Sequence, residues 1–190
     1  MSGFTLLEIV VVIAVIGILA GIALPVMSRA LAAMRLTGAA RSISNLTAAT
    51  KTKAAANFTR ARLFVDLTSN SYHIETWNGA AWVAAGGTTV LPTGVTFSFG
   101  VVATDPSTAP ISQAPACMDN ATPPAPIGGT ACMVFNSRGI PIDNAGNPTP
   151  LDELYITDGA NLVLGVTVAP TGLIGVWNTP ILAVPQWTLS

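Results

Sequence analysis

The feature that most constrains this chain is an uninterrupted apolar run near its N-terminus. From Ile9 to Leu24 the sequence reads IVVVIAVIGILAGIAL, without a polar or charged side chain. With its flanking residues, the apolar segment is about 20 residues long, enough for a helix to cross the hydrocarbon core of a bilayer. Glu8 is the one charged residue between Phe4 and Val26. The sequence therefore predicts a membrane-spanning helix over residues 4–26.

A cleaved secretory signal is the alternative interpretation of this run. Such a signal has a basic segment before about 7–15 apolar residues and a small-residue cleavage site after them. Here no basic residue precedes the run, and a helical pattern continues beyond Pro25. We therefore expect a retained membrane helix. An unpaired carboxylate at Glu8 would cost about 3 kcal/mol in a membrane, so its partner is expected outside the chain or at the chain terminus.

The residues GFTLLE at positions 3–8, followed by the apolar run, resemble the class III signal of type IV pilins and pseudopilins. The resemblance implies that a prepilin peptidase cleaves after Gly3 and that the new N-terminal residue, Phe4, is N-methylated. It implies that Glu8 pairs with the terminal amine of a neighbouring subunit. Pro25 lies where many such helices carry a kink, since an internal proline removes one helical hydrogen bond. The implied partners are other pilins or pseudopilins in a filament, the prepilin peptidase and an inner-membrane assembly platform.

The leader departs from the family pattern. Residues 1–3 carry no Lys or Arg, whereas leaders in this family are usually basic, and Arg29, Arg35 and Arg41 follow the apolar run instead. A positive-inside interpretation would invert the topology. We expect that a longer leader was lost through the choice of start codon; the alternative is that assembly factors override the charge bias.

Residues 27–57 predict a continuation of the helix outside the membrane. The segment is rich in Ala and contains no Pro, which favours helix. Its expected apolar stripe consists of Met27, Leu31, Met34, Leu36, Ala39, Ile43 and Leu46. A single helix from about Phe4 to Asn57 would be roughly 80 Å long. Its first half would lie in the filament core, and its second half would pack against a globular head.

The charge is strongly polarised along the chain. Seven basic residues and no acid lie between Arg29 and Arg62, whereas eight acids and only Arg138 follow. A basic stripe for DNA or anionic lipid is one interpretation. We favour the other, a solvated helix face balanced by the acidic heads of neighbouring subunits. The net charge of −1 gives no general case for a nucleic-acid-binding protein.

Residues 63–190 predict a β-rich head, which makes the fold class α+β: a long helix packed on a small antiparallel β-sheet head. The number of short strands allows two small sheets. Short alternating runs are separated by turn residues. The expected strands are 63–67, 72–76, 81–85, 88–91, 95–102, 131–136, 154–157, 162–169 and 172–177.

Three pieces of the head resemble the H-type pseudopilin and FimT-like minor pilin branch: LPTGVT at 91–96, VFNSRG at 134–139 and VTVAPTG at 166–172. DNA-binding FimT-like proteins carry arginines in the last hairpin, but residues 172–175 here read GLIG. Because phosphate contacts need Lys or Arg, no DNA-binding residues are predicted.

Residues 103–130 form a proline-rich break that we expect to be a long surface loop. Cys117 lies inside it, and Cys132 follows in the next expected strand. In an oxidising periplasm a disulfide is the natural assignment, stabilising by roughly 3 kcal/mol. A metal pair lacks further ligands, and a redox site lacks Cys-x-x-Cys spacing.

The remaining polar residues offer little chemistry. Asp143, Asn144, Asn147, Asp152 and Glu153 surround Gly146 and could supply oxygen ligands to Ca²⁺, but a plain turn is favoured. His73 has no partner ligand, and no nucleophile–base or metal constellation supports an enzyme. We therefore predict a non-enzymatic filament subunit without a cofactor or metal. It would be anchored once in the bacterial inner membrane, with a periplasmic head, and would then enter a pilus or pseudopilus.

Overall fold

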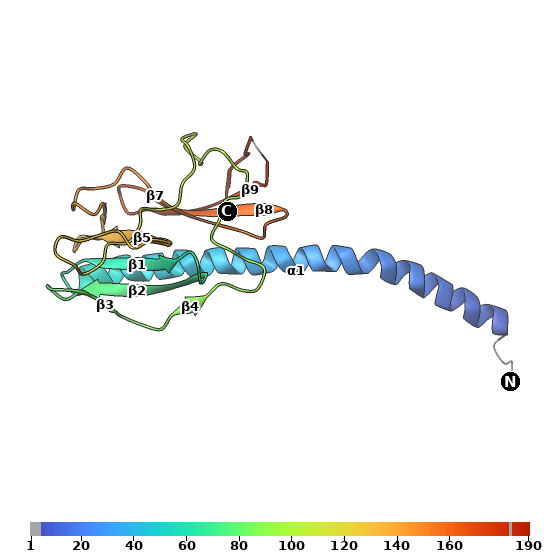
Figure 1. Cartoon of the computed structure of the whole chain (residues 1–190). Helices are drawn as coiled ribbons and strands as arrows, with labels where there is room; N and C mark the ends of the chain where they lie inside the picture. Colours follow the sequence, from blue (N-terminus) through green and yellow to red (C-terminus); the bar gives the residue numbers. More distant parts are fainter. Residues whose placement is uncertain (1–4, 183) are drawn as a thin grey trace. The chain divides into compact units, whose positions relative to one another are not determined.

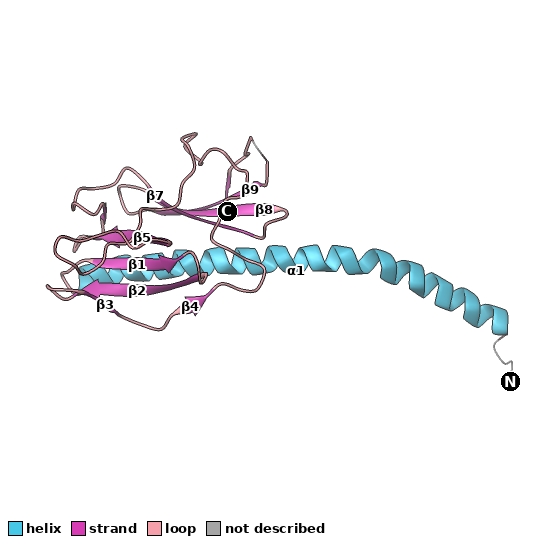
Figure 2. Ribbon diagram, in the orientation of Figure 1, coloured by secondary structure: helices cyan, strands magenta, loops and turns pink. Residues whose placement is uncertain are grey.

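The computed structural model of the protein describes residues 5–182 and 184–190 (Figure 1). One helix, α1 (Leu6–Ala56), precedes strands that form two antiparallel sheets (Figure 2). The strands are β1 (Ala61–Asp66), β2 (Ser71–Trp77), β3 (Trp82–Ala84), β4 (Thr89–Val90), β5 (Thr130–Phe135), β6 (Pro141–Ile142), β7 (Asp152–Thr157), β8 (Leu162–Val168), β9 (Ile174–Pro180) and β10 (Thr188–Leu189). The predicted α+β class is confirmed.

The chain divides into two compact units, residues 1–34 and 35–190. The boundary lies between Met34 and Arg35, because the helix contributes fully buried side chains only from Leu36 onward. Met27, Leu31 and Met34, which were expected in the apolar stripe, are exposed at 63%, 44% and 69%. The buried face of the helix consists of Leu36, Ala39, Ala40, Ile43, Thr47, Thr50 and Ala54, at the three- and four-residue spacing of one helix face.

The first sheet has the order β3-β2-β1-β5-β6, and β4 pairs with β2. Strand alternation gives it two different faces. Ala61, Leu63 and Val65 of β1 belong to the main core cluster, which also contains the buried residues of α1. Phe64 lies on the opposite face, in a second cluster with Cys117 and Cys132. The sheet is therefore covered on both sides, although only one side meets the helix.

The second sheet has the order β10-β9-β8-β7. Leu154 and Ile156 of β7 join the main core cluster. On the other face, Tyr155 and Val163 pack in a third cluster with Val102. Both sheets thus share one core with the C-terminal half of α1. This architecture buries apolar residues that neither sheet could bury alone.

The predicted strand at residues 95–102 is wrong. Only Thr96 pairs there, in an isolated bridge with Thr157, and the chain turns at Gly100, whose φ is +58°. Phe97 is nevertheless buried, and its backbone N–H donates to Asn70 Oδ1 at 3.0 Å. The alternating pattern therefore reflects a connection anchored to both sheets rather than a strand.

Residues 103–130 contain no named strand until β5 begins at Thr130, but they are not simply a surface loop. The Ala114 N–H donates to the Glu153 carbonyl of β7 at 2.7 Å, and the Cys132 N–H of β5 donates to the Pro115 carbonyl at 2.8 Å. The Gln113 side chain also mimics a strand, since its amide bonds both the N–H and the C=O of Tyr155 at 2.8 and 2.9 Å. This segment bridges the facing edges of the two sheets.

Candidate functional site

The start of α1 is fixed by a helix cap. The Glu8 backbone N–H donates to the Thr5 carbonyl at 3.1 Å and to Thr5 Oγ1 at 3.3 Å. Thr5 is thus an N-cap with Glu8 at the third helical position, the spacing of a capping box. This capping pattern, Thr5 followed three residues later by Glu8, is readable in the sequence. Gly3 and Phe4, the predicted processing residues, lie outside the described residues.

Glu8 lies in the exposed first turn of α1. Within residues 5–182 and 184–190 no basic group lies within ion-pair distance of its carboxylate. A carboxylate near a helix N-terminus gains from the helix dipole, but that gain leaves its ionic partner to be supplied from elsewhere. The structure therefore leaves Glu8 available for a partner outside the described residues.

The first unit exposes an apolar surface. Leu6, Ile16 and Ile22 are exposed at 83%, 59% and 63%, and the described large side chains between them are exposed at similar levels. By length and composition α1 could cross a membrane. The helical backbone continues through residue 25, so Pro25 does not end the helix; its role as a kink stays a prediction.

In the second unit, the basic residues near the end of α1 are largely engaged within the head. The Lys51 ammonium donates to the Gly172 carbonyl at 2.9 Å, and the Lys53 ammonium donates to the Ala85 carbonyl at 2.5 Å. Arg29, Arg35 and Arg41 are exposed. The basic segment is therefore not a uniform stripe, because tertiary contacts remove part of its charge from the surface.

Lys51 also explains the shape of the last hairpin. Gly172 has a φ of +76°, and a Cβ there would lie 2.8 Å from both the Gly139 carbonyl oxygen and the Lys51 nitrogen. Glycine is thus required for the conformation and for the space. The Lys51 ammonium is used to hold the hairpin backbone, which adds to the sequence argument against phosphate binding there.

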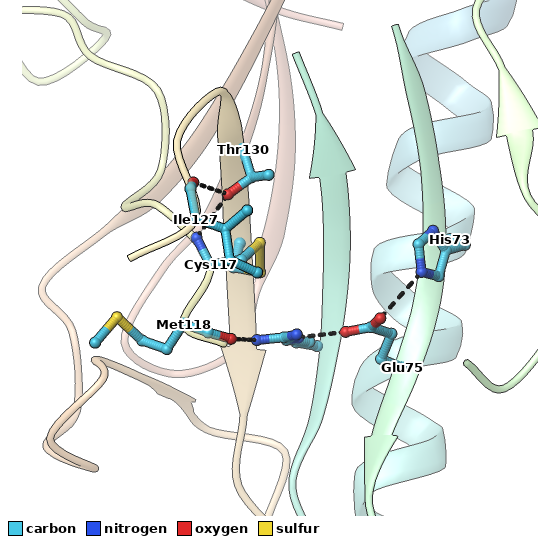
Figure 3. Close-up of a disulfide and its surroundings, with 8 residues drawn as sticks. His73, Glu75, Cys117, Met118, Ile127 and Thr130 are labelled. Atoms are coloured by element: carbon cyan, nitrogen blue, oxygen red, sulfur yellow. Dashed lines mark hydrogen bonds and ion pairs between the residues drawn. A yellow bond between two sulfur atoms is a disulfide. The ribbon is translucent and has the colours of Figure 1, made fainter. Parts of the chain in front are cut away.

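The proline-rich segment is fastened to the outer face of the first sheet (Figure 3). Cys117 and Cys132 form the expected disulfide, with Cα atoms 5.0 Å apart. Nearby, the Cys117 N–H donates to Thr130 Oγ1, and that hydroxyl donates to the Ile127 carbonyl (Figure 3). The disulfide joins the proline-rich segment, through Cys117, directly to Cys132 of β5.

Arg62 adds a second fastening beside the disulfide. Its side chain is only 4% exposed; Nε donates to the Glu75 carboxylate at 2.6 Å and Nη1 to the Met118 carbonyl at 2.7 Å. On its other side the Glu75 carboxylate contacts His73, with His73 Nε2 3.2 Å from Glu75 Oε1 (Figure 3). Burial lowers the pKa of Arg62, and the Glu75 carboxylate opposes that effect. A buried pair of this kind fixes geometry and is costly to break on one side. Its role here is structural.

Two buried acidic residues, Asp152 and Glu153, begin β7. Tyr155 donates its hydroxyl to Glu153, and burial, together with the Asp105 charge, raises the pKa of Glu153 to about 7. Burial likewise raises the pKa of Asp152 to about 7. Asp152 Oδ2 and Glu153 Oε1 have no hydrogen-bond partner among the described residues. Such carboxyls are costly to ionise, and the sequence could not reveal their burial.

The oxygen-rich stretch near Gly146 folds as the favoured turn. Asp143 Oδ1 accepts the Ala145 and Asn147 N–H groups at 2.9 and 2.8 Å, a turn closed by its own side chain. Across the described residues, no group of three or more His, Cys, Asp or Glu side chains could hold a metal ion.

Sequence reasoning missed one cluster altogether. Trp77 of β2 and Trp82 of β3 have ring centroids 5.4 Å apart, and the Arg60 guanidinium lies 4.8 Å from the Trp77 centroid. These residues line a hollow of about 290 Å³ with the Met118–Pro124 part of the proline-rich segment. The signal available in the sequence was two tryptophans flanking the Asn78-Gly79 turn, where hairpin pairing brings them together.

Comparison with known proteins gives one match. Residues 1–24 match the family model for the prokaryotic N-terminal methylation motif. No curated protein and no solved structure matches the chain. The matched segment contains the predicted cleavage and methylation positions, Glu8 and the whole apolar run from Ile9 to Leu24. This motif and a long helix packed on antiparallel sheets are both features of type IV pilin-like proteins, which the chain resembles in these two respects.

Proposed function

We propose that this protein is a minor pilin or pseudopilin, a structural subunit of a type IV pilus or of a type II secretion pseudopilus. The observation that carries the proposal is the methylation motif at residues 1–24 leading into an exposed apolar helix. A helix that exposes this much apolar surface needs a membrane or neighbouring helices around it. A filament subunit uses both in turn, first as a single-pass inner-membrane protein with its head in the periplasm and then in the filament.

Processing follows from the same proposal. Prepilin peptidase cleaves after Gly3, and the new N-terminal Phe4 is methylated. Glu8 then pairs with the terminal amine of a neighbouring subunit as the subunit leaves the membrane through the assembly platform. The support for this step is that the Glu8 carboxylate has no ionic partner within the described residues. In a medium of low dielectric constant such a charge strongly favours an opposite charge.

A major pilin is the alternative within the same class, and a DNA-uptake minor pilin is the alternative from the binding class. The second is disfavoured because the last hairpin carries no arginine and Lys51 is bonded to its backbone. Steeply salt-dependent DNA binding by the purified full chain would revive it.

The test compares Glu8→Gln and Glu8→Asp with the unaltered chain in cells that assemble the filament. Glu8→Gln is expected to insert in the membrane but to be lost from sheared filaments, whereas Glu8→Asp keeps the charge and retains part of the incorporation. Mass spectrometry of the mature chain should show methylated Phe4. Normal incorporation of Glu8→Gln would refute the charge-pairing account, and an unprocessed N-terminus would refute the processing account.

A further inference from the structure

We propose that the hollow beside Trp77 and Trp82 binds a neutral saccharide unit. The hollow lies entirely within the head, between the β2–β3 hairpin and the Met118–Pro124 segment, and has a volume of about 290 Å³. This is close to the lower end of the range for small-molecule sites, about 300–1,000 Å³, so it would accommodate one or two sugar rings. The filament function proposed above makes no use of this hollow.

The two tryptophan rings that line the hollow, Trp77 and Trp82, are held by each other and by two arginines. The Trp77 and Trp82 rings meet edge to face at 65°, Arg60 lies over both rings, and Arg62 lies 4.3 Å from the Trp82 centroid. Trp77 belongs to none of the three core clusters found among the described residues. A large ring that is fixed by cations but left outside a core is available to pack against the C–H face of a sugar.

The polar groups around the rings both donate and accept hydrogen bonds. Asn120 Oδ1 accepts a hydrogen bond from the Trp82 backbone N–H at 2.8 Å. This leaves the side-chain N–H₂ group of Asn120 without a partner among the described residues. Asn144 is exposed and makes no side-chain hydrogen bond within the described range. Asp119 uses Oδ1 to accept the Ala121 and Ala125 N–H groups, which leaves Oδ2 as an acceptor. Sugar hydroxyls match this mixture because each donates and accepts.

The charges of the lining favour a neutral ligand over an anion. Arg62 is paired with Glu75. Backbone N–H groups hold the pKa values of Asp119 and Asp143 below their usual range, so both carboxylates are ionised at neutral pH. Both line the hollow, as does Arg60. A phosphate or a nucleic-acid backbone would meet these two fixed negative charges, whereas a neutral polyol would not.

The experiment is a titration of the purified full chain in a detergent without a sugar headgroup, followed by tryptophan fluorescence and calorimetry. The neutral probes are the methyl glycosides of glucose, galactose and N-acetylglucosamine; the anionic probes are glucuronate and an oligothymidylate. We expect saturable binding of at least one neutral probe with a Kd of about 1 mM or lower. The anionic probes should bind more weakly.

Two variants locate the site. Trp77→Ala should weaken binding about tenfold, with Trp177→Ala as its control on the other sheet. Asn144→Ala, at an exposed position without side-chain hydrogen bonds, should weaken it about threefold, with Asn45→Ala as its control on the helix. If Trp77→Ala fails to fold, Asn144→Ala still tests the site. No binding of any neutral probe at about 10 mM, tighter binding of the anionic probes, or equal loss in the control variants would each overturn the proposal.

Discussion

The buried carboxyl of Glu153 makes the stability of the head depend on pH, and Glu153→Gln tests this. Glu153 is 7% exposed, accepts the Tyr155 hydroxyl and lies near the Asp105 charge. A glutamine has nearly the same shape as the protonated acid. Its amide oxygen can still accept from Tyr155, and its amide N–H₂ group can donate toward Asp105. The variant thus removes the ionisation while keeping the packing.

The magnitude follows from the two pKa values. Burial raises the pKa of Glu153 from 4.5 to about 7, so the folded protein holds a proton that the unfolded chain has lost between these pH values. Stability is therefore fully present below about pH 4.5 and falls as pH rises toward 7. Each pH unit between these two pKa values lowers the free energy of unfolding by about 1.4 kcal/mol, so the fall is roughly 3.5 kcal/mol in all.

The assay is urea denaturation of the full chain in detergent micelles, followed by tryptophan fluorescence between pH 4.5 and 8. All four tryptophans lie in the head, so their emission reports its unfolding. Glu153→Gln should be close to the unaltered chain at pH 4.5 and more stable by about 3.5 kcal/mol at pH 8.

Asp158→Asn is the control of opposite sign. Although burial raises the pKa of Asp158, hydrogen bonds from the Asn161, Ala160 and Leu162 N–H groups and from the Asn161 side chain lower it to about 2. Its carboxylate therefore stabilises the fold at neutral pH, and the variant should lose stability there. Parallel pH curves for Glu153→Gln and the unaltered chain would refute the claim that Glu153 is held protonated.

Three further changes test the packing of the head by urea denaturation of the same full chain. Reduction of the disulfide, or Cys117→Ser, should cost about 3 kcal/mol because the 15-residue separation constrains the unfolded chain; an unchanged midpoint would contradict this. Gly165→Ala should cost about 1–3 kcal/mol, since a Cβ there would lie 2.6 Å from the Tyr155 ring, and a neutral effect would show that the ring moves aside freely. Gln113→Ala leaves the Tyr155 N–H and C=O of β7 unpaired and should cost about 2 kcal/mol. Gln113→Glu can still accept from the Tyr155 N–H but cannot donate to the Tyr155 C=O, so it should recover only half of that loss.

The local sequence pattern predicted a helix or strand correctly where the structure of that element depends on its own residues. The apolar run and the Ala-rich segment after it predicted a helix to about residue 57, and it ends at Ala56. Alternation located most strands to within two residues, but it missed the two-residue strands β6 and β10, which are too short for a period to appear. It also misjudged residues 95–102, where apolar residues are buried by a connection rather than by a ladder.

The N-terminal motif, the spanning length of the apolar helix and the lone acid at its start could be predicted from the sequence alone, because they depend on residues adjacent in the chain. The sequence also left one natural partner for each cysteine. Which charges remain free depends instead on the folded arrangement of the head. Lys51, Lys53 and Arg62 meet groups far away in the sequence, and the hollow at Trp77 forms only when the hairpin meets the proline-rich segment. Such contacts depend on strand order and register, which no local pattern carries.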